Sequence, residues 1–475
     1  MFDNDQLSAI GFRFVTESIE LMTPYGESLA RRPHFYTGDE LPELLSEQRN
    51  VKKLMEAVAS RVSEVNGLMR LLMPVKDIRR SMDELAARTL SEVELFEIKR
   101  FLLQLELIAP ALSSLGLELE GINVAAMPRA LDLIDPEGMR SPSFYVSDKL
   151  SPLLGEIRRE RKTVDEQIKK AGLTDELSAR RTLLAAREEE ENARVRTELC
   201  IKLRDHRAEL MRNADSIGRL DLALGKARLA ESMGAVIPEV GCEEFVLKDM
   251  VNPRFAAALG EKGREFVPVS LELKKGSVVI TGANMGGKSI AIKTLALNAM
   301  LAMCGFAVFA KEAKLPMLGG LYLLSEDRED AMGGLSSFGG EMKAFDGILR
   351  ETEKQRDPLV LLDEFARGTN PHEGAALVRA AARLFNERNN AYAVIATHFD
   401  GVAKLARLHY QVAGLRSADA ETLDSGMKGG GTEALAKFMD YGLYPVSPDE
   451  EPPRDAVKII KALGVTEEFS ALIDV

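Results

Sequence analysis

One stretch, residues 274–294 (KKGSVVITGANMGGKSIAIKT), constrains the fold of this chain more than any other. A short β-branched run at residues 277–281 indicates a buried strand, and an apolar-periodic segment from Ile290 onward indicates a helix. Between them lies a match to G-x-x-x-x-G-K-[ST], the pattern of a phosphate-binding loop in its strand–loop–helix context. The alternative is a glycine-rich turn that matches by accident, which happens in only on the order of 1–2% of chains this long.

The residues of this loop predict a nucleotide site. Glycines let successive backbone N–H groups surround a phosphate, and the helix N-terminus adds its positive dipole end. Lys288 can supply a positive charge to the β- and γ-phosphates, and Ser289 a hydroxyl to Mg²⁺. We therefore predict ATP and Mg²⁺ as ligands, with Ser289 in the metal shell. The nucleotide-binding residues would be Gly282, Ala283, Asn284, Met285, Gly286, Gly287, Lys288, Ser289 and Ile290.

Length and composition indicate a soluble, multidomain protein. The 475 residues suffice for two to four domains, and 45% are hydrophobic while 29% are charged. Three scattered cysteines (Cys200, Cys242 and Cys304) lack C-x-x-C spacing, which argues against a disulfide framework or a zinc site and for the reducing cytoplasm. We expect no signal peptide and no membrane span, because no apolar run approaches the required length.

The charge balance bears on nucleic-acid binding. The net charge is −12, Trp is absent, and aromatic residues make up only 6% of the chain, so base-stacking surfaces are scarce. A protein whose main task is to grip DNA usually has a basic surface. A local basic patch is compatible with an acidic total, so composition weighs against DNA binding without excluding it.

Residues 1–150 predict a helical core domain without chemistry of its own. Apolar residues recur at helical spacing up to about residue 125, for example at Leu54, Val58 and Val65. Ser91 and Glu94 precede another apolar run and are typical of a capping box. Residues 126–150 are rich in turn-forming residues.

Residues 151–233 are strongly charged and predict two long helices, for which a coiled-coil hairpin is one arrangement. The turn is expected at residues 171–175, around Gly172, with Thr174 or Asp175 as the N-cap of the second helix. The acidic run at residues 188–191, with arginines on both sides, predicts a solvated helix face.

Residues 241–475 predict an α/β domain with a mostly parallel sheet, preceded by the all-α part. Strands alternate with helices there, which is typical of a parallel sheet. We expect strands at residues 278–281, 320–324, 359–363 and 391–397. A glycine-rich segment at residues 417–431 predicts a mobile loop, and residues 454–473 a short helical tail.

Three further motifs follow the phosphate loop. An apolar strand ends in Asp363 and Glu364, and in this context Asp363 can hold Mg²⁺ while Glu364 orients or deprotonates the attacking water. His398 ends another apolar strand; it is either a satisfied core histidine or a residue facing the γ-phosphate. Residues 336–342 (SSFGGEM) open a helix whose N-terminus can bind an anion, although alone they indicate only a turn.

Together these motifs carry a family resemblance. TGANMGGKS, LSSFGGEM, LLDEFARGT and ATH resemble the MutS family of ABC-class ATPases, whose pattern is TGPNMGGKS, STF-x-x-EM, LLDE-x-GRGT and ATH. The resemblance covers residues 241 to about 412. It implies a P-loop ATPase of the ABC class, with residues 1–150 as the core, 151–233 as lever helices and the tail as a helix–turn–helix.

The resemblance also implies site residues and a dimer. Lys288, Glu364 and His398 would be catalytic, and Phe266 would stack on the adenine. Ser336 would reach the γ-phosphate of the opposite subunit, so the active unit would be a homodimer or a heterodimer with a related chain.

Departures from the family pattern leave two functions open. Asn252 stands where the family usually has His, Ser337 stands where it has Thr, and we find no counterpart of the mismatch-reading domain with its Phe-x-Glu motif. Family membership favours a DNA-binding ATPase of the mismatch-repair or recombination type, without mismatch specificity. The alternative is a protein-remodelling ATPase, such as a reactivating partner of a B12-dependent aminomutase, with little or no DNA binding.

Overall fold

A computed structural model describes residues 2–141, 143–282, 287–325, 337–414 and 440–450. The chain divides into two compact units. The sheet unit comprises Met1–Ile19, His34–Gln48 and Leu229–Val475, and the helical unit comprises Glu20–Pro33 and Arg49–Arg228. The predicted glycine-rich loop at residues 417–431 and the predicted tail at residues 454–473 lie outside the described residues.

The larger sheet has six strands in the described residues, in the order β10-β9-β4-β8-β7-β6. All neighbours are parallel except the antiparallel edge pair β10 and β9. Every residue of β4, β7 and β8 is buried, as expected for parallel strands covered on both faces. The strands are β4 (Gly276–Thr281), β6 (Leu321–Leu324), β7 (Leu359–Asp363), β8 (Tyr392–Ala396), β9 (Leu408–Gly414) and β10 (Asp440–Val446). The four predicted strands are confirmed as β4, β6, β7 and β8, whereas β9 and β10 were not predicted.

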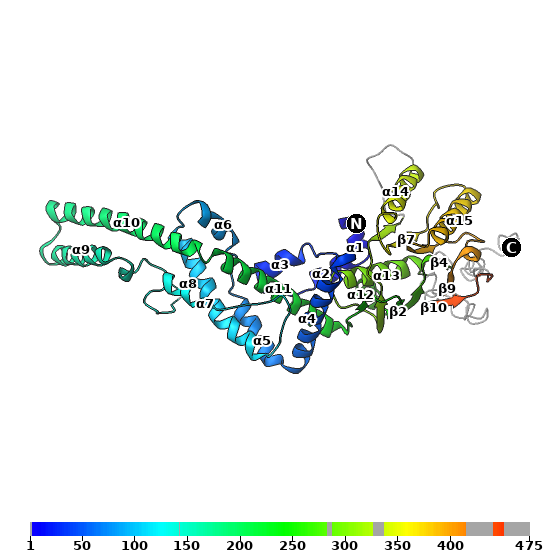
Figure 1. Ribbon diagram of the computed structural model, residues 1–475, viewed down its shortest axis with the longest axis horizontal. Coiled ribbons are helices and arrows are strands. Elements are labelled where there is room, and N and C mark those ends of the chain that lie inside the picture. Colours follow the sequence, from blue (N-terminus) through cyan, green and yellow to red (C-terminus); the bar gives the residue numbers. More distant parts are fainter. Residues whose placement is uncertain (1, 142, 283–286, 326–336, 415–439, 451–475) are drawn as a thin grey trace. The chain divides into compact units, whose positions relative to one another are not determined.

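Helices cover both faces of this sheet (Figure 1). Two helices, α14 (Ser337–Thr352) and α15 (Pro371–Arg388), share one core with strand residues such as Val360 and Ile395. The helix α13 (Lys288–Met303) contributes nothing to that core yet contacts β6, β7 and β8, so it lies on the opposite face. It also contacts the strand β2 (Phe245–Met250), which belongs to a second sheet, and it is buried on nearly every side, which matches its mostly apolar sequence.

A second sheet of four strands, in the order β1-β5-β2-β3, was not predicted. Its strands are β1 (Glu239–Val240), β2 (Phe245–Met250), β3 (Val269–Leu273) and β5 (Glu312–Leu315). Three short helices accompany it in the sheet unit, α1 (Asn4–Ala9), α2 (Phe12–Glu17) and α12 (Pro253–Gly260). The helix α2 contacts α12 and α13, which is why residues 1–19 group with the sheets and not with the helical part to which the sequence assigned them.

The helical unit is built from α3 (Pro24–Ala30), α5 (Val62–Leu72), α6 (Arg79–Ala87), α7 (Glu92–Ser114), α8 (Pro128–Ile134), α9 (Pro152–Ala171) and α10 (Asp175–Arg204). Two further helices, α4 (Leu41–Ser60) and α11 (Arg207–Met233), have residues in both units. The capping box predicted at Ser91 and Glu94 is present at the start of α7. No helix in the described part of the chain is long and apolar enough to cross a membrane.

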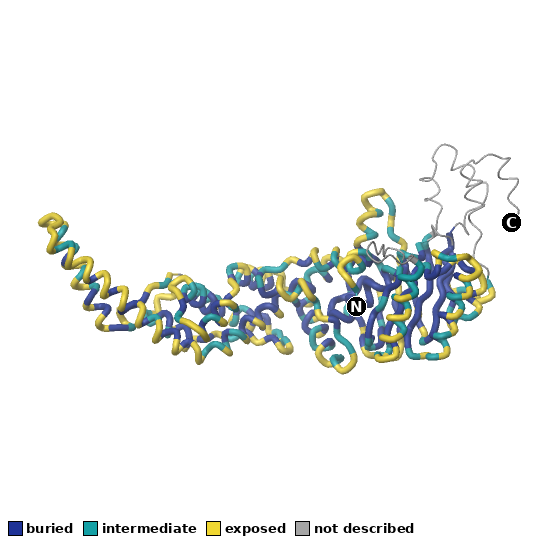
Figure 2. The backbone as a smooth tube through the Cα atoms, turned by 90° about the horizontal axis from the view of Figure 1, so that it is seen from above, coloured by how far each residue is buried: buried dark blue, intermediate teal, exposed yellow. Residues whose placement is uncertain are grey.

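Residues 151–233, all of them described, form three long helices instead of the predicted two, because α10 ends at Arg204 and α11 starts at Arg207. The predicted turn is confirmed: α9 ends at Ala171 with Gly172, at φ of 84°, as its C-cap, and Thr174 is the N-cap of α10. The pair α9–α10, which we call the hairpin, has an apolar core of Ile157, Val164 and Leu184. Figure 2 shows that the end of the hairpin that carries the turn is mostly exposed.

The prediction of a solvated face at residues 188–191 is wrong for two of the four glutamates. Glu188 and Glu191 are buried, at 8% and 6% exposure. They share the stripe of Leu184 and Val195 at helical spacing and therefore face inward. Arg158 and Arg161 of α9 form ion pairs with Glu188.

Glu191 is stabilised in its charged form by two partners. Hydrogen bonds from Arg194 and from the Ser151 hydroxyl lower the pKa of Glu191 to about 2. A glutamate whose charge is paired in this way can be buried between two amphipathic helices. The charge pattern of the sequence alone therefore could not distinguish a buried glutamate from a solvated one.

Candidate nucleotide site

The predicted phosphate-binding loop is bounded by two glycines with positive φ, Gly282 and Gly287. Gly282 follows β4 with φ of 133°, and a Cβ there would lie 3.1 Å from Val412 Cβ and 3.3 Å from the Val412 carbonyl oxygen of β9. Gly287 has φ of 93° and is the N-cap of α13. Side chains at either position would be strained, so these two glycines are required by the geometry. Ala283, Asn284, Met285 and Gly286 lie outside the described residues.

Lys288 is the first residue of α13 and is almost fully buried. Its ammonium donates a hydrogen bond of 2.6 Å to the carbonyl oxygen of Gly282 and lies 3.7 Å from Glu364 Oε1. Burial lowers the pKa of Lys288, and the neighbouring carboxylates of Glu364 and Asp363 oppose that shift. A buried ammonium beside a glycine-bounded loop is suited to bind phosphate oxygens.

Ser289 and Asp363 meet at the start of α13. The Ser289 hydroxyl donates a hydrogen bond of 3.0 Å to Asp363 Oδ1 at the end of β7. Burial raises the pKa of Asp363, while the Ser289 hydrogen bond and the charge of Lys293 act in the opposite direction. A hydroxyl and a carboxylate at this separation are the hard oxygen ligands that Mg²⁺ prefers, so this pair fits the predicted metal.

Glu364 is presented by a strained turn. Its φ of 55° is left-handed, and its backbone N–H donates to the carbonyl oxygen of Ala396 in β8 at 3.1 Å. Its Oε2 accepts a hydrogen bond of 2.7 Å from Arg367. The Glu364 carboxylate thus lies between two cations, Lys288 and Arg367, next to Asp363. Arg367 was not among the predicted site residues, although its spacing of three from Glu364 in the FARGT motif was a usable signal.

The region that contains these residues is similar to known proteins. Residues 278–428 match the family description "MutS domain V". The DNA mismatch repair protein MutS of Thermus aquaticus is 36% identical over 257 residues, which are 53% of this chain and 30% of that protein. Endonuclease MutS2 of Enterococcus faecalis is 31% identical over 244 residues, 49% of this chain and 29% of that protein.

This part of the chain is a domain V of the MutS family. The resemblance that the motifs predicted is confirmed, and the matched segment contains most of β4 and all of α13 and β7, with their candidate site residues. The chain matches less than a third of the length of these two relatives, so their whole-protein activities bear on it only as proposals.

Three further predicted residues are His398, Phe266 and Ser336. His398 is exposed, two residues beyond β8, with its ring centroid 4.5 Å from that of Phe399. The end of β8 is joined to β4, because the Thr397 N–H donates to the carbonyl oxygen of Ile280 at 3.0 Å. Phe266 is half-buried in the loop that leads into β3, and Ser336 lies outside the described residues.

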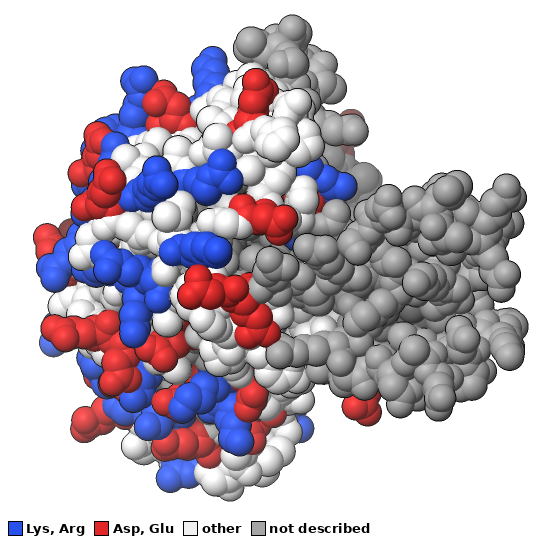
Figure 3. All heavy atoms as spheres, turned by 90° about the vertical axis from the view of Figure 1, so that its right-hand side faces the viewer, with Lys and Arg blue, Asp and Glu red and all other residues white. Residues whose placement is uncertain are grey.

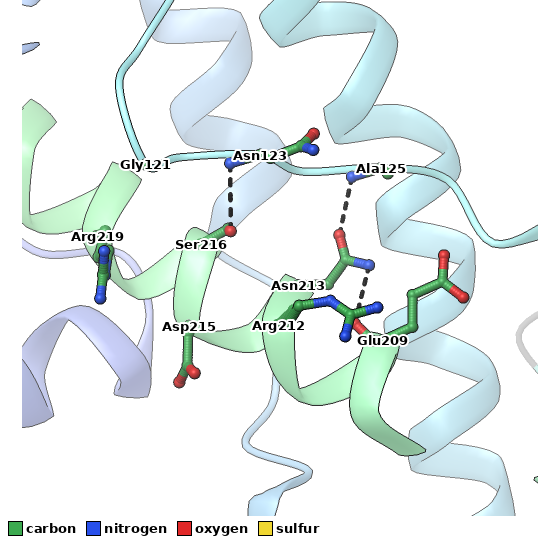
Figure 4. Close-up of a pocket in the computed structure, with 9 residues that line it drawn as sticks. All are labelled: Gly121, Asn123, Ala125, Glu209, Arg212, Asn213, Asp215, Ser216 and Arg219. Atoms are coloured by element: carbon green, nitrogen blue, oxygen red, sulfur yellow. Dashed lines mark hydrogen bonds between the residues drawn. The ribbon is translucent and has the colours of Figure 1, made fainter. Parts of the chain in front are cut away.

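A hollow in the helical unit contains none of the predicted site residues. It has a volume of about 420 Å³ and is lined by residues 121–125 and by one side of α11 (Figure 4). Asn213 and Ser216 of α11 accept hydrogen bonds from the backbone N–H groups of Ala125 and Asn123. These side chains therefore hold the loop against the helix, which is a structural task.

Proposed function

We propose that this MutS-family chain binds and hydrolyses ATP with Mg²⁺. The observation that carries the proposal is the pairing of the start of α13 with the end of β7. Ser289 donates a hydrogen bond to Asp363, and the adjacent Lys288 lies within ion-pair distance of the adjacent Glu364. Four chemically matched groups in one place are far more specific than any of the motifs alone.

Each residue then has a distinct task. Lys288 binds the phosphate oxygens through its charge, and Ser289 and Asp363 hold Mg²⁺. When bound, Mg²⁺ supplies charge neutralisation at the phosphate oxygens. Glu364 orients the attacking water and accepts its proton, a task that suits a carboxylate held by a defined turn.

Two substitutions test this assignment. Lys288→Ala should abolish tight ATP binding, because the buried charge that offsets the phosphates is lost. Glu364→Ala should bind ATP normally but hydrolyse it at least about 100-fold more slowly, because only the positioning of water is lost. Fluorescent nucleotide titration and phosphate release measure the two effects, with the exposed Lys274 changed to Ala as the matched control. Hydrolysis by Glu364→Ala at the wild-type rate would refute the assignment.

We further propose that ATP drives a dimeric switch that acts on DNA. Support comes from relatives named for DNA mismatch repair. On the described surface in Figure 3, however, basic and acidic side chains are interspersed, and the net charge of the whole chain is −12. These charges favour the alternative of a protein target.

A salt titration separates the two targets. If DNA is the target, binding in the presence of a non-hydrolysable ATP analogue should weaken steeply as salt rises, because each phosphate contact releases a counterion. No DNA binding at low salt in any nucleotide state would instead favour the protein-remodelling alternative.

A further inference from the structure

The turn after β7, residues 364–366, has a strained backbone conformation at two positions. Glu364 and Ala366 have φ of 55° and 61°, the left-handed region that residues other than glycine rarely adopt. Such conformations persist only where neighbouring groups fix them, and they gather at functional sites. The groups that fix this turn therefore also determine where the Glu364 carboxylate lies.

A carboxylate from another element supports the turn. Ala366 is fully buried, and its backbone N–H donates a hydrogen bond of 3.1 Å to Oε1 of Glu341, the fifth residue of α14. A buried N–H needs an acceptor, and an ionised one binds it strongly. The helix α15 also packs closely against Ala366, because a Cβ added to Gly374 of α15 would lie 2.7 Å from the Ala366 carbonyl oxygen.

A second contact joins α14 to the same turn. Phe345 lies four residues after Glu341, on the same side of α14, and its ring centroid is 4.6 Å from that of the buried Phe365. Glu341 and Phe345 thus contact two successive residues of the turn, one through a hydrogen bond and one through apolar packing. The segment of α14 from Glu341 to Phe345 therefore packs directly against the turn that presents Glu364.

We propose that Glu341 is a positioning residue for ATP hydrolysis: its carboxylate holds Ala366 in the left-handed conformation that directs Glu364 toward Lys288 and Asp363, and so links the position of α14 to the hydrolytic step. The inference rests on the proposed ATPase function. Glu341 touches neither nucleotide nor metal in this scheme. Its loss therefore affects catalysis and leaves nucleotide affinity unchanged, because Lys288 and Ser289 belong to α13.

Three substitutions of Glu341 distinguish the effect of its side-chain length from the effect of its charge. Glu341→Ala removes the acceptor, and Glu341→Asp keeps the charge but is one methylene too short to reach Ala366. Both should lower kcat by about 10- to 100-fold, the range typical of a catalytic group misplaced by roughly 1 Å. Glu341→Gln keeps an oxygen acceptor at the same reach and should stay within about threefold of wild-type kcat. All three should bind ATP with wild-type affinity.

The control is Asp346→Ala, which removes an exposed carboxylate paired with Arg350 on the same helix and should leave kcat unchanged. Thermal unfolding identifies any variant that fails to fold; in that case the comparison of Glu341→Gln with Glu341→Asp decides. Wild-type kcat in Glu341→Asp, or a fall in ATP affinity that parallels the fall in kcat, would overturn the inference. If Glu364→Ala is inactive while every Glu341 variant is normal, the ATPase proposal stands and only this inference fails.

Discussion

At the residue scale, the charged groups of the candidate site are buried at a cost to stability. Burial raises the pKa of Asp363 and lowers that of Lys288, so the surroundings disfavour the charged form of each. Charged groups that lower the stability of the folded chain but can bind a ligand are typical of functional sites. A neutral substitute should therefore stabilise the protein and impair its function.

Asp363→Asn tests this expectation. Without ligands, the variant should unfold at a temperature roughly 2–4 °C higher than wild type, the shift that about 1 kcal/mol produces in a domain of this size. The amide can still accept the Ser289 hydrogen bond, and Lys288 keeps Glu364 as a partner. Mg²⁺-dependent hydrolysis should be lost. Differential scanning calorimetry and phosphate release measure the two effects, and a lower unfolding temperature would contradict the argument.

The same substitution makes a prediction about pH. A carboxyl whose pKa is raised on folding destabilises the folded state while it is ionised, and the penalty is removed as the pH falls through the raised pKa toward the ordinary value of 3.8. The stability gap between Asp363→Asn and wild type should therefore be largest at neutral pH and close on acidification. Calorimetry at several pH values between 7 and about 4 would show it; a gap that widens in acid would contradict the burial of this charge.

At the element scale, the hairpin depends on a buried charge. Glu188 accepts from Arg158 and forms an ion pair with Arg161 across the α9–α10 contact. Glu188→Ala removes the carboxylate that pairs with both arginines, although Arg158 keeps its ion pair with Asp148. The variant should lower the local opening free energy of the hairpin by about 1–3 kcal/mol. Hydrogen exchange of the α9 and α10 amides measures this. The matched control is Glu190→Ala, exposed on the same helix, which should change exchange little. If Glu188→Ala and Glu190→Ala change hydrogen exchange equally, the ion pairs of Glu188 contribute nothing to the stability of the hairpin.

The hairpin turn gives a functional prediction at the same scale. We propose that residues 151–233 act either as the lever that the family resemblance implies or as a partner-docking arm. Replacing residues 171–175, which include Gly172 and the N-cap Thr174, with a Gly/Ser loop should leave basal ATP hydrolysis nearly intact and weaken its stimulation by the true target. Phosphate release with and without DNA checks this. Collapse of basal hydrolysis would mean that the hairpin belongs to the ATPase machinery.

At the scale of the whole molecule, the proposed dimer has composite sites. Lys288→Ala disables a chain's own phosphate loop, and Ser336→Ala, at a position outside the described residues, would disable the site of its partner. Each variant alone should be nearly inactive. In an equal mixture with free subunit exchange, about half of the dimers are mixed and each has one intact site, so activity should recover to roughly a quarter of wild type.

The mixture has its own controls. Differential tags on the two variants establish that mixed dimers form. If they form and the mixture stays as inactive as its parents, Ser336 does not complete the partner's site in the way proposed or the two sites cannot act singly. Specific activity of the wild type that does not fall on dilution to monomer would exclude a composite site.

The sequence by itself determined the local parts of this protein. The β-branched run, the glycines and Lys288 predicted β4, its loop and α13, because strand, turn and helix preferences act over a few residues. The motif set also predicted MutS membership. Asp363 and Glu364 are adjacent in the sequence at the end of an apolar strand, so the sequence could predict that they belong to one site.

Only the tertiary structure decided which distant groups meet. Glu341 and Ala366 are 25 residues apart, and no periodicity indicates that one accepts the other's N–H. The inward position of Glu188 depends on arginines of a different helix, and the edge strands β9 and β10 depend on pairing with β4 and with each other. Burial and long-range pairing are properties of packed elements, and local preference is overridden wherever packing stabilises the alternative.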